Sequence, residues 1–184
     1  MSVNNQEQLS DPPLARDGID LVGGLLAVMA LGIAVIAMIG PVFPWWVRAG
    51  WEWQWFIWDL SGLRVTTENQ YSGLAVTVFG FFCGFCSFIS IMNVIIRPKS
   101  PFFAIPKLIL SGGAIITVVA GLDLASGLTS EYWNPGFGII VSFLAGLGLM
   151  VVATGMIVLF TVRAKSYQHD RGNLVQTDDI KDFD

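Results

Sequence analysis

Apolar residues occur along the chain in four long runs separated by short polar stretches. Three runs contain no charged residue, and the remaining one has Lys107 near its start and Asp123 near its end. A helix needs roughly 20 residues to cross the hydrocarbon core, and a backbone in lipid must satisfy its own hydrogen bonds, which excludes open strands. The runs therefore predict an all-α integral membrane protein, a four-helix bundle with spans at about 21–43, 72–96, 102–125 and 136–162.

Composition supports a membrane environment. Only 13% of the 184 residues are charged and 54% are apolar, with a mean hydropathy of +0.65, whereas soluble domains carry about 25% charged residues. The net charge of −4 disfavours a nucleic-acid partner. The expected surroundings are the lipid bilayer and either other membrane protein subunits or further copies of the chain.

The first run follows a polar leader containing Arg16, as a signal peptide would. Its 23 apolar residues are too many for a signal-peptide core, so we expect an uncleaved span. With the N-terminus inside, cytoplasmic flanks hold eight of the ten Lys and Arg residues, and the outer side holds only Arg48 and Arg64. The positive-inside rule thus predicts cytoplasmic termini in a plasma or inner membrane, and the short loop 97–101 makes spans two and three antiparallel neighbours.

The two ends of the chain look different from the spans. Residues 1–18 and 164–184 are polar and have no apolar period, so flexible cytoplasmic tails are expected. Between them, 19–163 forms the transmembrane domain. Its first outer loop, 44–71, is predicted to form a small extracytoplasmic cap.

This outer loop is rich in tryptophan. Six of the seven tryptophans of the chain are Trp45, Trp46, Trp51, Trp53, Trp55 and Trp58. As a strand, "WEWQW" alternates aromatic and polar residues, "DLSG" suits a turn, and "LRVTTEN" returns as a second strand. As a helix, Trp51, Trp55 and Trp58 share one face. The turn residues favour a β-hairpin over an interfacial helix.

Tryptophan has an apolar ring and one hydrogen-bond donor. It is enriched at the headgroup level of membranes and, with arginine, at protein–protein contacts. The six tryptophans and Arg64 are therefore predicted to anchor the cap on the bilayer or to bind a partner; an aromatic ligand or carbohydrate site is a further alternative.

"CGFC" in the second span places Cys83 and Cys86 one turn apart. A CxxC in a four-helix membrane protein resembles the DsbB-type thiol–quinone oxidoreductases, which implies a redox pair that passes electrons to a quinone. That family has a second cysteine pair and a CxxC near the outer end of its helix. Here there are only two cysteines, and Cys83 lies about ten residues, roughly 15 Å, below that end. A role in packing is the competing interpretation.

Small residues recur within the spans. Gly80 and Gly84 form a GxxxG motif, and Gly146 and Gly148 lie in the fourth span. Such residues let helix backbones approach closely, either within one bundle or between subunits. We predict that these four glycines are helix-packing positions.

Ionisable groups offer few candidates for chemistry. Asp123 lies near the outer end of its span, where it is predicted to pair with Arg48. The single histidine is in the C-terminal tail, and no hydrolase, P-loop or zinc motif is present. The sequence therefore predicts neither an enzyme nor a cofactor or metal site.

The layout of four spans, inner termini and a larger first outer loop is similar to that of claudin-type tetraspan proteins, although the loop has no cysteine. The expected function is that of a structural or accessory subunit of a membrane complex, which makes contacts through the Trp-rich loop and the small-residue faces. The alternative is an oligomeric transporter or channel component with a polar pathway lined by residues such as Thr77, Ser87, Ser90, Asn93 and Thr117. A thiol–quinone oxidoreductase is the third hypothesis.

Overall fold

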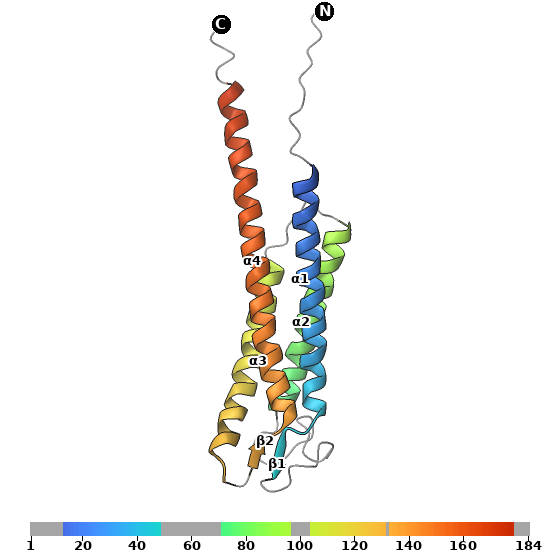
Figure 1. Ribbon diagram of the computed structural model, residues 1–184, viewed down its shortest axis with the longest axis vertical. Helices are drawn as coiled ribbons and strands as arrows, with labels where there is room; N and C mark the ends of the chain where they lie inside the picture. Colours follow the sequence, from blue (N-terminus) through green and yellow to red (C-terminus); the bar gives the residue numbers. More distant parts are fainter. Residues whose placement is uncertain (1–12, 49–70, 97–103, 132, 179–184) are drawn as a thin grey trace, which may run out of the picture.

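The computed structural model describes residues 13–48, 71–96, 104–131 and 133–178, which form four antiparallel helices packed as a bundle (Figure 1). Each helix contains an apolar stretch long enough to cross a membrane, so the predicted four-helix membrane fold is confirmed. The elements, in chain order, are α1 (Pro13–Ile39), the 3-10 turn η1 (Gly40–Val42), β1 (Trp46–Arg48), α2 (Ser72–Ile96), α3 (Ala104–Thr129), β2 (Trp133–Pro135) and α4 (Phe137–Asp178).

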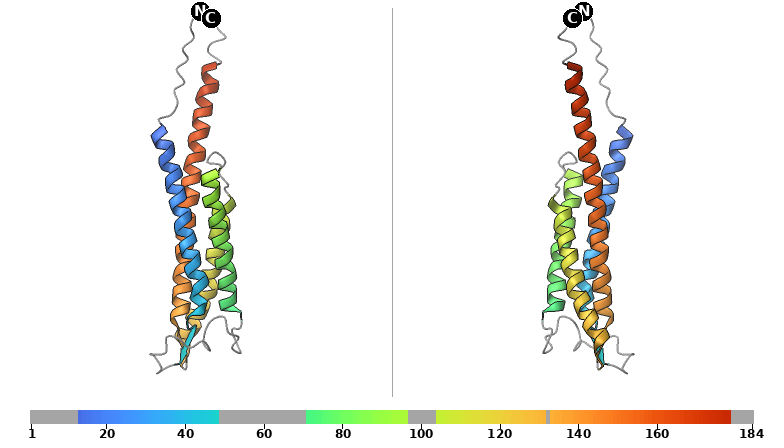
Figure 2. Two further views of the ribbon diagram at one scale, coloured as in Figure 1. Left: turned by 90° about the vertical axis from the view of Figure 1, so that its right-hand side faces the viewer. Right: turned by 90° about the vertical axis from the view of Figure 1, so that its left-hand side faces the viewer.

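The helices pack in the cyclic order α1, α2, α3, α4. α1 packs against α2 and α4, and α3 packs against the same two helices. The prediction that the second and third spans are neighbours is therefore confirmed. α1 begins and α4 ends at one end of the bundle, the terminus end, while β1 and β2 lie at the opposite end, the sheet end (Figures 1 and 2).

The outward faces of the bundle are apolar. Large side chains such as Phe81, Phe85 and Val151 are 63%, 55% and 73% exposed. Similar side chains face outward along α1 and α3 as well. Because such continuous apolar surface matches lipid and not water, these faces contact the bilayer.

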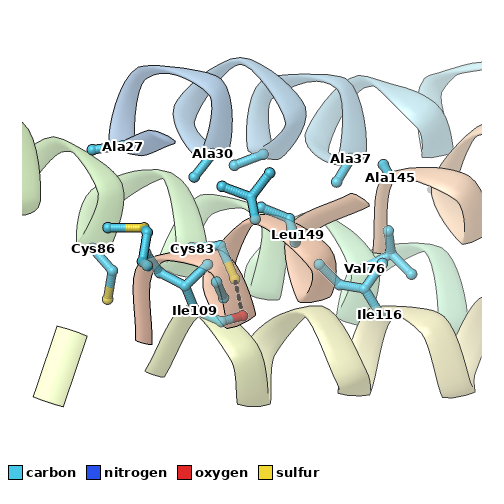
Figure 3. Packing of buried hydrophobic residues seen from close by; sticks show 14 of the residues in the cluster. Ala27, Ala30, Ala37, Val76, Cys83, Cys86, Ile109, Ile116, Ala145 and Leu149 are labelled. Atoms are coloured by element: carbon cyan, nitrogen blue, oxygen red, sulfur yellow. Dashed lines mark hydrogen bonds between the residues drawn. The ribbon is translucent and has the colours of Figure 1, made fainter. Parts of the chain in front are cut away.

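The interior is built around small residues on α1. Ala27, Ala30, Ala34 and Ala37 are fully buried, and their 3-4-3 spacing keeps them on one helix face. Figure 3 shows Ala27, Ala30 and Ala37 along this face. On α2, Gly80 lies over this face, so a Cβ at that position would come within 3.1 Å of the Met38 nitrogen. Close helix packing of this kind replaces the hydrophobic drive that lipid removes.

Two helices are longer than the sequence analysis expected. α1 already begins at Pro13, a residue suited to the first turn because it has no N–H to leave unpaired. α4 continues past its apolar stretch, which ends at Val162, to Asp178, where a flexible tail was predicted. Extending an existing helix avoids the cost of nucleation, so a polar segment joined to a stable span stays helical without an apolar face of its own.

The strands connect the two loops at the sheet end. β1 pairs antiparallel with β2, with Trp46 opposite Pro135 and Arg48 opposite Trp133. The predicted hairpin within the first loop involves residues 51–69, which lie outside the described residues. The described pairing joins segments from different loops.

Candidate functional site

The sheet end contains a buried polar pair. Trp45 follows η1 closely, and its indole Nε1 donates a hydrogen bond of 2.8 Å to Oδ2 of Asp123 on α3. The two side chains are 2% and 5% exposed. In a bilayer, a carboxyl group without a hydrogen-bond donor would be costly to bury. The indole supplies the donor that the surrounding apolar side chains cannot provide.

Backbone contacts fix the second loop on the same segment. Gly136 N donates to Trp45 O at 2.8 Å, and Gly138 N donates to Pro44 O at 3.0 Å. A Cβ on Gly136 would overlap the Pro44 carbonyl oxygen, and one on Gly138 would lie 2.6 Å from Gly40 O. We call Trp45, Asp123, Gly136 and Gly138 the sheet-end lock, because together they hold the end of α1 against α3 and the start of α4.

The lock changes two predictions. Trp45 was expected at the bilayer surface or a partner contact, but its side chain lies inside the bundle and is closed to both. Asp123 was expected at the interface beside Arg48. It is buried six residues before the end of α3, and its described hydrogen bond comes from Trp45. The side chain of Arg48 lies outside the described part of the structure, so its ion pair stays a prediction.

Trp46 is half-buried and packs against α3, where a Cβ on Gly127 would come within 2.7 Å of its ring atom Cζ3. The other residues predicted for anchoring or binding lie outside the described residues: Trp51, Trp53, Trp55, Trp58 and Arg64. The described chain ends at Arg48 and resumes at Tyr71. We call residues 49–70, which include Trp51, Trp53, Trp55 and Trp58, the Trp-rich segment. The lock therefore holds the chain just before this segment begins.

The predicted packing glycines lie between helices of the bundle. Gly80 and Gly84 face Ala34 and Met38 of α1, and Gly148 faces Ile33 of the same helix. Gly146 lies against α3, where a Cβ would come within 2.8 Å of Thr117 N. These faces are occupied within the chain, which removes them as surfaces for other subunits.

The cysteine pair lies in the interior. Cys83 is fully buried, Cys86 is 5% exposed, and both thiols are free. The Cys83 thiol donates a weak hydrogen bond to Ile109 O, with an S–O distance of 3.8 Å. Its position is more than two turns below the sheet-end terminus of α2 at Ser72. The redox role stays a prediction.

Sequence reasoning missed two features of the interior. The alanine spacing on α1 is visible in the sequence, but hydropathy alone does not distinguish alanine from its apolar neighbours. Ser142 of α4 is fully buried, and its Oγ lacks a hydrogen-bond partner. It fits against Gly40, where any Cβ would overlap it. Only the close approach of η1 and α4 reveals that contact.

Burial predicts slow thiol chemistry. In folded protein in detergent micelles, Cys83 and Cys86 are expected to react with N-ethylmaleimide mainly on unfolding, because Cys83 is fully buried and Cys86 is only 5% exposed. Mass spectrometry of the time course measures the modification. A third thiol introduced by Glu131→Cys, at an exposed position outside the spans, should react at once. Rapid modification of all three thiols would contradict the described burial.

No family model, curated protein or solved structure matches this chain. The layouts shared with thiol–quinone oxidoreductases and claudin-type proteins therefore gain no support from these comparisons. The functional interpretation rests on the chemistry of the described residues.

Proposed function

We propose that the chain is a structural or accessory subunit of a membrane complex, with a Trp-rich outer cap that contacts partner proteins. The lock is the observation that carries the proposal. Strands and backbone hydrogen bonds join the two loops, and the Trp45–Asp123 hydrogen bond attaches the first loop to α3, at the place where the Trp-rich segment begins. A fixed base lowers the entropy lost when a segment binds, which suits a contact surface.

The orientation belongs to the same proposal. Positive charge is concentrated beside the terminus end, which favours cytoplasmic termini in a plasma or inner membrane and an outer position for the sheet end. The small-residue faces were expected to contact partners as well. Because they lie within the bundle, partner contact is assigned to the Trp-rich segment alone.

The hydrogen bonds of the polar side chains favour a structural role over a transport pathway. Three of the five side chains proposed to line a transport route donate to their own helices: Thr77 to Gly73 O at 3.0 Å, Ser87 to Cys83 O at 2.8 Å and Thr117 to Gly113 O at 2.8 Å. Hydroxyls used in this way have no free proton to offer a solute. The buried carboxyl of Asp123 is likewise engaged by Trp45. These contacts also give no support to an enzymatic role.

The test combines native extraction with a matched pair of variants. The chain is extracted from its own membrane in mild detergent, sized, and its companions are identified by mass spectrometry. Stoichiometric companions are expected to remain with the wild type and to be lost from a Trp51→Ala/Trp53→Ala/Trp55→Ala variant. The matched control, Phe81→Ala/Phe85→Ala/Phe88→Ala, removes three aromatic rings from the outward face of α2 and should retain them.

Two results would contradict the proposal. Companions that stay with the tryptophan variant would exclude the Trp-rich segment as the contact. A homo-oligomer without companions, which conducts ions or solutes in liposomes, would favour the alternative of a small transporter or channel component. Size-exclusion profiles and helicity of both variants check that the bundle remains folded.

A further inference from the structure

The outward face of α3 changes character along its length. Its exposed side chains share one side of the helix, because most of them are spaced by three or four residues. We call this face the α3 stripe; its members are Ala104, Lys107, Leu108, Ser111, Ile115, Val118 and Leu122. The polar members lie toward the terminus end of the bundle, and the part toward the sheet end is apolar. From Leu108 to Leu122 the stripe covers roughly 21 Å, more than the ~15 Å of one hydrocarbon leaflet.

Two contacts of α3 fix its position along the neighbouring helices. A Cβ on Gly112 would overlap the sulfur of Cys83 on α2. A Cβ on Gly113 would lie 3.0 Å from Leu149 Cβ on α4. Because α3 runs antiparallel to both helices (Figure 1), each residue nearer to the start of α3 is level with a later residue of α2 and of α4.

On this alignment Lys107 lies level with Phe88 of α2 and Gly155 of α4. The apolar stretches of these two helices end at Ile95 and Val162, each about seven residues, or roughly 10 Å, nearer to the terminus end. In Figure 2, α3 likewise begins short of the ends of α2 and α4. The backbone of Lys107 therefore lies within the apolar layer, at a depth from which a lysine side chain extends toward the lipid headgroups.

No described side chain neutralises the Lys107 ammonium group. Among the side chains that the structure describes, only Asp123 and Glu131 carry carboxylates, and both lie toward the sheet end. Asp123 is roughly 24 Å away along α3. Ser111, one turn deeper on the stripe, donates its hydroxyl to Leu108 O at 2.9 Å. A charge in the apolar layer is costly without a partner, and an anion from outside the described residues would remove that cost.

A phospholipid matches both parts of the stripe. Its phosphate accepts hydrogen bonds from the three N–H groups of a lysine, and its acyl chains match the exposed side chains of Ile115 and Val118. Charge complementarity favours an anionic lipid, because a zwitterionic one carries its own cation beside the phosphate. We propose that the α3 stripe binds one anionic phospholipid, with the phosphate at the Lys107 ammonium group. The proposal is independent of the accessory-subunit function.

Native mass spectrometry of the full chain in dodecyl maltoside tests the proposal. The probes are phosphatidylglycerol and phosphatidylcholine with identical acyl chains, so that only the headgroup differs. The wild type is expected to bind the first phosphatidylglycerol about fivefold more tightly, the factor for one basic residue at an anionic lipid surface. Lys107→Gln should lose this preference. Lys107→Arg keeps the charge and should retain it.

A second lysine distinguishes a site from general attraction. Lys165 lies beyond Val162, where the apolar stretch of α4 ends, so Lys165→Gln removes the same charge from outside that stretch and should keep the preference. If the acyl chains lie along the stripe, Ile115→Ala/Val118→Ala should weaken the binding of both lipids alike. Helicity measured by circular dichroism checks that every variant is folded.

Four results would overturn the proposal. Equal affinity of the wild type for the two lipids would exclude an anionic site. An undiminished preference in folded Lys107→Gln would mean that the ammonium group extends into water without a lipid. Equal loss of preference in Lys107→Gln and Lys165→Gln would mean that the terminus end attracts anionic lipid diffusely. Unchanged binding by Ile115→Ala/Val118→Ala would remove the stripe from the site.

Discussion

Gly146→Ala is expected to destabilise the bundle by about 2–3 kcal/mol, although the change adds only one methyl group. The new Cβ would lie 2.5 Å from Thr117 Oγ1 and 2.8 Å from Thr117 N. Neither neighbour can move away easily. The nitrogen belongs to the backbone of α3, and the hydroxyl is held by its hydrogen bond to Gly113 O. The helices must separate locally, which loses packing along the α3–α4 contact.

Two other glycines provide matched controls for Gly146. Nothing lies within 4 Å of a Cβ placed on Gly32, which faces outward from α1, and one on Gly84 would meet Ala34 Cβ at 3.7 Å, an ordinary contact. Gly32→Ala and Gly84→Ala should therefore be neutral or slightly stabilising, since alanine is the better helix former by about 1 kcal/mol.

Reversible unfolding in mixed dodecyl maltoside and sodium dodecyl sulfate micelles, followed by helicity, measures all three variants. If Gly146→Ala were as stable as Gly32→Ala, the close approach of α3 and α4 at this point would be wrong. Equal destabilisation by all three would mean that the loss does not depend on the close contact with Thr117, and would contradict the packing explanation.

The spans could be predicted because a 20-residue apolar run has few alternatives. Lipid permits only helices there, so length and hydropathy decide the outcome without knowledge of the neighbours. The rotation of each helix is harder to predict. In α1 nearly every residue is apolar, so the buried face carrying Ala27 and Ala34 differs from its surroundings only in residue size. Hydropathy contains no signal for that difference.

The sheet-end lock could not be predicted from the sequence, for a different reason. Trp45 and Asp123 are 78 positions apart. An aspartate near a span end predicts that a donor will be found, but the outer loop offered several, among them Arg48 and Arg64. The choice depends on where Trp45 is placed between η1 and β1, and β1 pairs with β2 from a different loop. Such pairing between distant loops carries no local pattern.

The C-terminal end of α4 shows the opposite error. Polar composition after Val162 predicts a flexible tail, but composition alone decides order only for a segment that must nucleate its own helix. A segment that continues an already formed helix does not need to nucleate a helix of its own. The helix therefore reaches Asp178, and the boundary of the apolar stretch marks the membrane and not the end of the helix.

Trp45→Phe is expected to destabilise the bundle by about 2 kcal/mol, because it leaves the buried Asp123 carboxyl without its indole donor. The substitution also makes the ring smaller, so the effect of losing the hydrogen bond must be distinguished from the effect of losing side-chain volume. In an Asp123→Leu background no carboxyl group is left without a donor. The same substitution should then lower the free energy of unfolding by about 1 kcal/mol or less. The coupling energy between the two positions is then about 1–2 kcal/mol, at the upper end for interhelical hydrogen bonds in membranes.

Unfolding in mixed micelles of the wild type, both single variants and the double variant gives this coupling energy directly. Additive effects would mean that Trp45 contributes only by packing, and the lock would lose its polar component.

The Trp45 and Asp123 variants also distinguish the role of the lock from the partner contacts of the Trp-rich segment. If that segment binds partners, Trp45→Phe should lower both stability and partner retention, because the lock fixes the chain just before the segment begins after Arg48. The Trp51→Ala/Trp53→Ala/Trp55→Ala variant should lose partners at unchanged stability. A Trp45→Phe protein that is destabilised yet retains every companion would show that the lock serves the bundle alone, and that the segment binds without a fixed base.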